Sequence, residues 1–192
     1  NTGKTSVFNK LTGLNQHVGN FPGVTVDKKT GKFKLDDRTV EIIDLPGTYS
    51  IYPHSQDEQV VFEVLNDPKH PDHPDALMVV VDASNLERNL LLFTQVYDLK
   101  IPVMLIMNMS DMAFKAGKKF NAEAFAQRFP GVPVVETNAR AGMGMNRIRE
   151  VIQKGFSTEG FQPVIAGYSL KDKTDQAGQS EETNQRFDFI RK

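Results

Sequence analysis

Cysteine is absent from this sequence, and so are long apolar runs and any large excess of charge of one sign. Without cysteine the chain cannot form a disulfide framework, a thiolate zinc site or a cysteine-ligated iron–sulfur cluster. A formal net charge of −1 provides no basic field to attract nucleic acid, so we expect no nucleic-acid partner. No stretch approaches the roughly 18 consecutive apolar residues that cross a bilayer, and no signal peptide opens the chain. These absences favour a soluble, cytosolic piece of protein.

The 192 residues, 39% of them hydrophobic, are enough for one sizeable core. Apolar or alternating runs predict strands, at 29–35, 39–43, 76–82, 103–107 and 134–137. Apolar residues at helical spacing predict helices, at 5–14, 57–65, 86–97, 122–128 and 143–154. The segment 17–25 is rich in Gly, Pro and Asn and is predicted to be an irregular loop. Buried strands that alternate with amphipathic helices predict an α/β fold, a mostly parallel sheet with helices on both faces.

The first residues, Asn1-Thr2-Gly3-Lys4-Thr5-Ser6, are typical of the end of a phosphate-binding loop. In such a loop Lys4 neutralises the β- and γ-phosphates, the Thr5 hydroxyl binds Mg²⁺, and Gly3 lets the backbone approach the phosphates. We expect the first glycine of the loop and the strand that precedes it to lie upstream of residue 1. Gly-Lys-Thr alone is a weak signal, because the tripeptide is common by chance.

A second motif, Asp44-Leu45-Pro46-Gly47, follows an apolar strand. There Asp44 would hold Mg²⁺ through water, and the N–H of Gly47 would approach the γ-phosphate. A plain turn is an equally good explanation when the motif is taken alone, because Pro and Gly favour turns. Asp44, Asn108 and Asn138 all follow predicted strands, at the sheet edge where ligands bind in such folds.

A third motif, Asn108-Met109-Ser110-Asp111, would read the base. The carboxylate of Asp111 can accept two parallel hydrogen bonds from N1–H and the 2-amino group of guanine, whereas adenine lacks that donor pair. The alternative is a strand end with Asp111 capping the next helix. Ala139, after the last strand, would donate its backbone N–H to guanine O6. Because the motifs occur in this order and in their expected contexts, together they predict a guanine-nucleotide site.

These residues resemble the cytosolic N-terminal G domain of FeoB-type ferrous iron transport proteins, a P-loop GTPase domain with the Ras-like fold. The resemblance covers about residues 1–155. It is carried by the runs Val18-Gly19-Asn20-Phe21-Pro22-Gly23-Val24-Thr25-Val26, Asp44-Leu45-Pro46-Gly47-Thr48-Tyr49-Ser50 and Asn108-Met109-Ser110-Asp111.

The resemblance implies a GTPase that binds GTP or GDP with Mg²⁺ and is activated by K⁺. It implies that Thr25 closes on Mg²⁺ beside Thr5 and Asp44, and that Asn1 binds K⁺ with the carbonyls of Gly19 and Phe21. Lys4, Thr25, Gly47 and Asn1 would be catalytic. The residues around the nucleotide would be Asn1, Thr2, Gly3, Lys4, Thr5, Ser6, Val24, Thr25, Asp44, Gly47, Asn108, Met109, Asp111, Asn138, Ala139 and Arg140.

Turnover is expected to be slow and potassium-dependent. Position 48 is Thr where Ras-like enzymes carry a water-orienting Gln, and no arginine finger is evident, so a monovalent cation would supply the missing charge. Two alternatives stay open: a module that senses GTP or GDP with negligible hydrolysis, and a soluble ribosome- or tRNA-associated GTPase.

The domain organisation expected from the resemblance is a G domain over 1–155, then a linker and the remnant of a helical domain over 156–192. The resemblance further implies a membrane transport domain in the same polypeptide and a location at the cytoplasmic face of a bacterial inner membrane. A homo-oligomer is left open.

Overall fold

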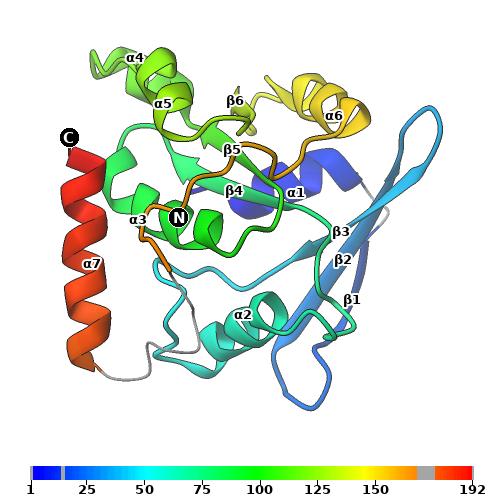
Figure 1. The fold of residues 1–192 in the computed structure, drawn as a ribbon. Coiled ribbons are helices and arrows are strands. Elements are labelled where there is room, and N and C mark those ends of the chain that lie inside the picture. The colour runs from blue at the N-terminus through cyan, green and yellow to red at the C-terminus, as the bar shows by residue number, and fades with distance from the viewer. Residues whose placement is uncertain (1, 14–15, 168–175, 192) are drawn as a thin grey trace.

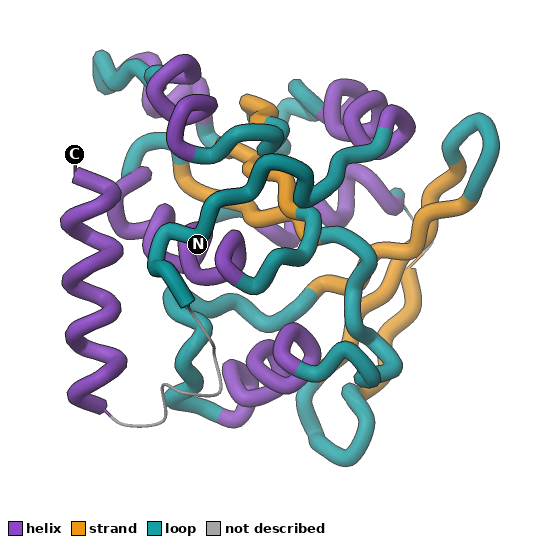
Figure 2. Tube along the Cα trace, in the orientation of Figure 1, coloured by secondary structure: helices purple, strands orange, loops and turns teal. Residues whose placement is uncertain are grey.

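The computed structural model describes residues 2–13, 16–167 and 176–191. Its strands form two three-stranded sheets, with helices packed around them (Figure 1). Figure 2 shows the strands in two groups, one of them extending away from the body of the molecule as a long hairpin. Among the described helices, none has both the length and the apolar character needed to cross a membrane. The predicted α/β class is confirmed.

The first sheet is antiparallel, in the order β1-β2-β3, from Gln16–Asn20, Asp27–Lys34 and Thr39–Asp44. The hairpin of β2 and β3 turns where it was predicted. The expectation of an irregular loop over 17–25 is wrong for its first residues, which form β1. Every residue of β1 is exposed, so this edge strand is held by backbone pairing with β2 and has no alternating apolar pattern.

The second sheet is parallel, in the order β4-β5-β6, from Leu77–Asp82, Val103–Asn108 and Val134–Glu136, as predicted. All six residues of β5 are buried. Met104 and Ile106 belong to the apolar cluster that includes α1, Lys4–Thr12, and α6, Met145–Lys154. Leu105 and its alternate neighbours belong to the cluster on the other face. Cover on both faces explains the continuous apolar run.

The other face is covered by three helices that were also predicted, α2 (Gln56–Asn66), α3 (Leu86–Asp98) and α5 (Ala122–Arg128). Four aromatic rings pack together here, with centroid distances of 4.8–6.1 Å. Phe93 and Tyr97 belong to α3, Phe125 belongs to α5, and Phe129 directly follows α5. A short helix, α4 (Ser110–Lys115), was not predicted. It has six residues, too few to show a helical period.

The last described helix, α7 (Gln176–Arg191), packs beside α3 (Figure 1). The sequence predicted only a linker with a trace of helix at its end. The reason is chemical: α7 buries charge. The fully buried guanidinium of Arg186 pairs with Asp98 at 2.8 Å and Glu182 at 2.7 Å, and Glu182 also accepts from the Tyr52 hydroxyl. Of the tail before α7, residues 156–167 contain no helix or strand, and 168–175 lie outside the described residues.

The two sheets are not paired with each other within the described ranges. An apolar cavity of about 130 Å³ lies along β4 on the side of the segment that follows β3, lined by residues 77–81 and 45–49 among others. In β4 only Val81 is fully buried, in contrast with all of β5. The edge of β4 on the side of β3 is therefore only partly covered, because this cavity lies beside it.

Candidate functional site

The end of the phosphate-type loop is fixed by contact with the end of β5. Gly3 has φ +82°, in the left-handed region, and α1 begins at the next residue. A Cβ atom at position 3 would lie 2.2 Å from Nδ2 of Asn108, so this position requires glycine in both space and dihedral angle. The same Nδ2 donates to the carbonyl of Thr2 at 2.9 Å. The backbone before α1 is thereby held against the carboxyl end of the parallel sheet.

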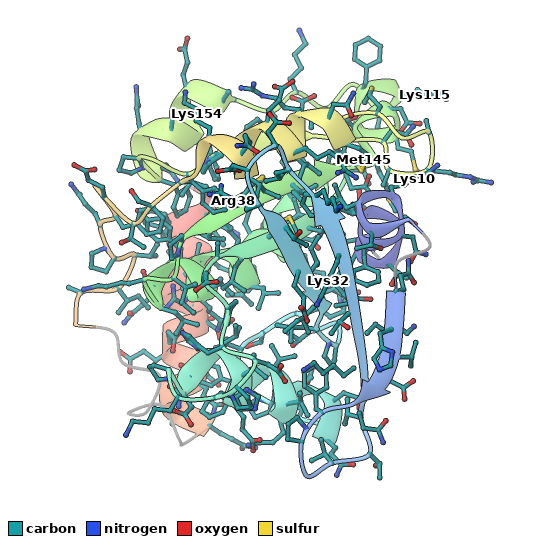
Figure 3. The ribbon with its side chains drawn as sticks, turned by 90° about the vertical axis from the view of Figure 1, so that its right-hand side faces the viewer. Lys10, Lys32, Arg38, Lys115, Met145 and Lys154 are labelled. Carbon is teal, nitrogen blue, oxygen red and sulfur yellow. The ribbon has the colours of Figure 1, made fainter. Side chains whose placement is uncertain are left out.

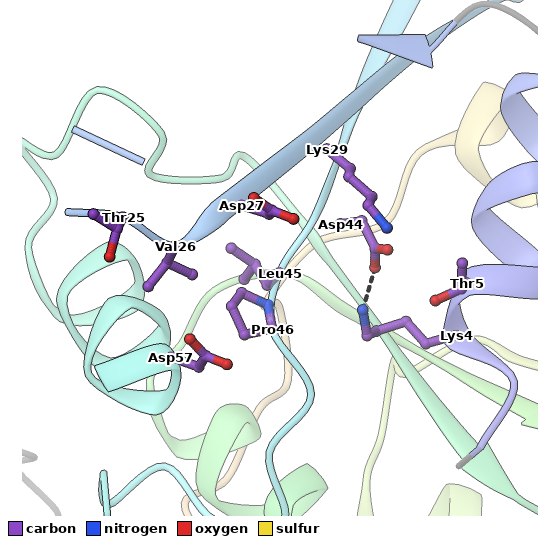
Figure 4. Close-up of a pocket in the computed structure, with 10 residues that line it drawn as sticks. All are labelled: Lys4, Thr5, Thr25, Val26, Asp27, Lys29, Asp44, Leu45, Pro46 and Asp57. Atoms are coloured by element: carbon purple, nitrogen blue, oxygen red, sulfur yellow. Dashed lines mark hydrogen bonds and ion pairs between the residues drawn. The ribbon is translucent and has the colours of Figure 1, made fainter. Parts of the chain in front are cut away.

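Four of the predicted phosphate and Mg²⁺ residues line one cavity of about 450 Å³ (Figure 4). The ammonium of Lys4 forms an ion pair with the carboxylate of Asp44, whose side chain is 6% exposed. Thr5 lies beside Lys4 in the first turn of α1, and Thr25 lies across the cavity. The full lining is Lys4, Thr5, Thr25, Val26, Asp27, Lys29, Asp44, Leu45, Pro46 and Asp57.

The donor set of this cavity fits a hard divalent cation. Two hydroxyls, from Thr5 and Thr25, and the Asp44 carboxylate are oxygen ligands of the kind that Mg²⁺ prefers. The N-terminus of α1 adds unpaired backbone N–H groups and the positive end of the helix dipole, which favour an anion. One cavity thus combines groups for a phosphate with groups for its metal ion.

Gly47 lies on the segment after β3 and does not line this cavity. It lines the apolar cavity together with Thr2 and Lys4, and a Cβ atom there would meet nothing within 4 Å. Packing therefore does not demand glycine at this position, unlike at Gly3. The next residue, Thr48, has its hydroxyl 3.0 Å from Oε1 of Glu58, which ties it to the first turn of α2.

Asn108 joins three segments through one buried amide. Nδ2 donates to Thr2, while Oδ1 accepts from the Thr137 hydroxyl at 3.1 Å and from the Ala139 backbone N–H at 2.9 Å. The Ala139 backbone N–H, predicted to contact guanine O6, donates to Asn108 in this arrangement. Asn108 itself thus connects these three segments, and its contact with a base stays a prediction.

The remaining predicted base contacts lie at the start of α4 and in the turn after β6. Met109 has φ +60° and precedes α4, and the half-buried Asp111 is in its first turn. The Asp111 carboxylate has no hydrogen bond or ion pair within the described ranges. Asn138 uses Oδ1 to accept from Ala141 N at 3.1 Å, and Arg140 is exposed. Asp111 is therefore the member of this set whose acceptors stay available.

Comparison with known proteins decides the family. The model of the family described as ferrous iron transport protein B matches residues 1–152. This chain belongs to the ferrous iron transport protein B family. A fusion protein of Fe(2+) transport protein A and the Fe(2+) transporter FeoB from Porphyromonas gingivalis is 41% identical over 152 residues, covering 79% of this chain and 18% of the relative. The chain thus spans about a fifth of the length of such curated relatives.

Solved structures of the FeoB family share the fold. The cytosolic domain of L. pneumophila FeoB aligns with a TM-score of 0.83 and 30% identity, covering 100% of this chain and 92% of that one. The cytosolic domain of the T. maritima FeoB iron transporter in its GMPPNP form aligns with a TM-score of 0.82 and 28% identity, again over 100% of this chain and 92% of that one. The fold is that of a P-loop GTPase.

The residues predicted to bind K⁺ are not brought together among those that the structure describes. Gly19 lies in β1, opposite Lys28, and the carbonyl of the buried Phe21 accepts from Val24 N at 3.3 Å. Neither residue lines the cavity that holds Lys4, and the half-buried Val24 does not either. Asn1 lies outside the described residues.

Lys29 of this FeoB-family chain was not among the site residues predicted from the sequence. It lines the Lys4 cavity and lies directly opposite Asp44 in the antiparallel register of β2 and β3. A signal existed: Lys29 shares the side of β2 with Gly31 and Phe33, both buried, and a charge among inward positions demands a reason.

Proposed function

We propose that this chain binds GTP and GDP with Mg²⁺, hydrolyses GTP, and acts as the nucleotide-controlled part of a ferrous iron transporter. The observation that carries the proposal is the cavity shared by Lys4, Thr5, Thr25 and Asp44 in a chain of the FeoB family. Support comes also from the T. maritima relative, whose structures are described in GMPPNP and GDP forms.

In this proposal the N-terminus of α1 and the Lys4 ammonium bind the β- and γ-phosphates. Thr5 and Asp44 hold Mg²⁺, Asp44 through water, and Thr25 joins them when the nucleotide is a triphosphate. The ion supplies a positive charge where negative charge develops on the transferred phosphoryl group. Gly47 offers its N–H to the γ-phosphate. Ser6 and Thr2 complete the loop around the phosphates.

For the base, Asp111 accepts from N1–H and the 2-amino group of guanine. Asn108 keeps the loops of Thr2 and Ala139 in place, so its role is positioning. Met109, Asn138 and Arg140 border the base on the same side of the sheet. The contact of Ala139 with guanine O6 requires its N–H to leave Asn108 or to be shared with it.

For hydrolysis, we propose that K⁺ binds to Asn1 and to the carbonyls of Gly19 and Phe21, and contributes the charge that an arginine finger supplies elsewhere. Gly19 and Phe21 do not line the cavity, so the proposal requires residues 19–25 to move toward Lys4. Turnover without this charge would be slow.

The test is GTP hydrolysis by the full-length protein in KCl and in NaCl at equal ionic strength, with Asn1→Ala measured alongside. Stimulation by K⁺ that is lost in Asn1→Ala supports a cation-assisted GTPase. Equal, barely detectable rates in both salts would contradict it.

A second candidate, a sensor of GTP or GDP with negligible hydrolysis, is favoured by one observation. Position 48 carries no glutamine, and its threonine hydroxyl lies within hydrogen-bond distance of Glu58. Among the described residues that follow Gly47, the structure therefore shows no side chain placed to orient the attacking water. Nucleotide binding without turnover in either salt would support the sensor.

As for domain organisation, we propose that residues 1–155 form a G domain, that 156–192 are a linker and the remnant of a helical domain, and that the chain belongs to a transporter at the cytoplasmic face of a bacterial inner membrane. Nucleotide state would reach the membrane part through the Thr25 loop and the segment after Gly47.

A further inference from the structure

Lys29 occupies a position where a lysine needs an electrostatic reason. Along β2 the alternate residues Gly31 and Phe33 are buried, and Lys29 continues the same side of the strand toward the cavity. Its side chain is only partly exposed. Removing a charged group from water costs free energy unless an opposite charge or a hydrogen bond replaces the water. The position therefore favours a partner for the Lys29 ammonium.

Two other lysines of β2 have carboxylate partners of their own. Lys28 pairs with Asp72, and Lys32 pairs with Glu41 at 3.0 Å on the outer surface. Lys29 forms no ion pair within the part of the chain that the structure describes. Asp44, directly across the strand pair, is already bound to Lys4. Lys29 is thus a cation that lines the cavity and has no direct contact with a carboxylate of the described residues.

Among the charged groups that line the cavity, only the two lysines attract an anion. Three carboxylates, from Asp27, Asp44 and Asp57, face two ammonium groups, from Lys4 and Lys29. Figure 4 shows Lys29 directed toward Asp44 and the end of Lys4, from the strand that leads back to Thr25. Lys4 belongs to the loop at the start of α1, whereas Lys29 belongs to the opposite wall. A phosphate chain that begins at α1 would bring its outermost phosphate to that wall.

We propose that Lys29 binds the terminal phosphate of the nucleoside triphosphate and so makes the site favour triphosphate over diphosphate. This inference rests on the proposed nucleotide-binding function. A charge-assisted hydrogen bond from Lys29 to a γ-phosphate oxygen would be formed with GTP and absent with GDP. The same ammonium offsets the negative field of Asp27, Asp44 and Asp57, which otherwise opposes the approach of the outermost phosphate.

A contact with the γ-phosphate and a simpler role, in which Lys29 only neutralises Asp44, predict different nucleotide affinities. Asp44 would serve Mg²⁺ with either nucleotide, so a residue that acts only through Asp44 would affect both affinities alike. A residue that contacts the γ-phosphate changes the affinity for the triphosphate alone. The ratio of the two affinities therefore distinguishes the roles.

The experiment measures binding of GMPPNP and GDP, each with Mg²⁺, to the full-length protein. The variants are Lys29→Gln and Lys29→Met, which remove the charge, and Lys29→Arg, which keeps it. Lys32→Gln is the matched control, because it removes a lysine from the same strand on the outer face. Urea unfolding of each variant shows whether it is folded.

We expect Lys29→Gln and Lys29→Met to bind GMPPNP about tenfold or more weakly and to bind GDP within about twofold of the unmodified protein. Lys29→Arg and Lys32→Gln should leave the ratio of affinities unchanged. An equal loss for both nucleotides, or no loss in a folded neutral variant, would overturn the inference and leave the proposed function intact. If the unmodified protein binds neither nucleotide, the proposed function itself fails.

Discussion

The ammonium of Lys4, the first residue of α1, forms an ion pair with the carboxylate of Asp44, the last residue of β3. The pair brings the cation proposed for phosphate into contact with the carboxylate proposed for Mg²⁺. The two functions are therefore coupled, because a phosphate draws Lys4 away and a metal ion draws Asp44 away. A substitution of Lys4 should therefore change the affinity for Mg²⁺ at Asp44, and a substitution of Asp44 should change the affinity for phosphate at Lys4.

Asp44→Asn should raise the Mg²⁺ concentration needed for half-maximal GMPPNP binding by about tenfold or more, because it removes the charge that orients the hydrated ion. Glu41→Gln, on the same strand but exposed and paired with Lys32, is the control and should have no effect. The measurement is a Mg²⁺ titration of GMPPNP binding. An unchanged midpoint in Asp44→Asn would place the ion elsewhere.

Gly3→Ala should abolish nucleotide binding and destabilise the fold. Position 3 combines φ +82° with a Cβ that would lie 2.2 Å from Asn108. The left-handed conformation alone costs about 1–2 kcal/mol for alanine, and the clash adds to it. Gly117→Ala is a matched comparison, since φ is +69° there and a Cβ would meet nothing within 4 Å.

Gly117→Ala should therefore show the dihedral cost alone and should still bind GDP. Urea unfolding and GDP titration of both variants provide the measurement. Equal behaviour of the two variants would show that contact with Asn108 does not restrict position 3.

Arg186→Met should lower the free energy of unfolding by about 3–5 kcal/mol, because it leaves Asp98 and Glu182 buried beside an apolar side chain. Arg191→Met, in the same helix, breaks an exposed pair with Glu87 and should cost about 0–1 kcal/mol. Denaturant unfolding of both variants compares them. Similar small losses would show that α7 is not anchored through Arg186.

The tip of the β2–β3 hairpin should show a pH-dependent contact with α6. Gln153 Nε2 donates to Asp37 at 2.9 Å, which lowers the pKa of the Asp37 carboxyl. Arg38 at the same tip donates to the carbonyl of Ile152 at 2.7 Å, and Figure 3 shows it beneath α6. Since the folded pKa is lowered, the contact stabilises the protein above the unfolded pKa and is lost as pH falls through the folded value.

Gln153→Ala should therefore raise the pKa of Asp37 toward its ordinary value, as measured by NMR titration of its carboxyl carbon. Lys154→Ala, on the same helix turn but exposed, is the control. A pKa of Asp37 that is unaffected by Gln153→Ala would show that the hydrogen bond does not persist in solution.

The sequence predicted those parts of the fold that are held by apolar burial. β5 is apolar throughout because both its faces are covered, and α3 shows its helical period because one side packs on the core. The sequence did not predict strand β1 or the full helix α7, for two different reasons. Strand β1 exposes every side chain, and α7 buries Glu182 and Arg186 in an ion-pair network. Neither leaves a hydrophobic pattern in the sequence.

The candidate site shows the same division. Lys4, Thr5, Thr25 and Asp44 were predicted from motifs whose chemistry fixes the residue types, and they share one cavity. The use of the Ala139 N–H by Asn108 could not be predicted, because it depends on how three loops meet. Lys29 could be suspected from its place on the inward side of β2, but only the register shows that it lies opposite Asp44.

The measurement that tests the account most directly is the base preference of the full-length protein. GDP, ADP and xanthosine diphosphate would be titrated into the unmodified protein and into Asp111→Asn. We expect the unmodified protein to prefer GDP over ADP by about 100-fold or more, because adenine would leave the Asp111 carboxylate unpaired. In Asp111→Asn the amide can accept from N1–H and donate to the 2-oxygen of xanthine, so preference should move to xanthosine diphosphate. Equal binding of GDP and ADP, or a preference for GDP that Asp111→Asn leaves unchanged, would contradict the account.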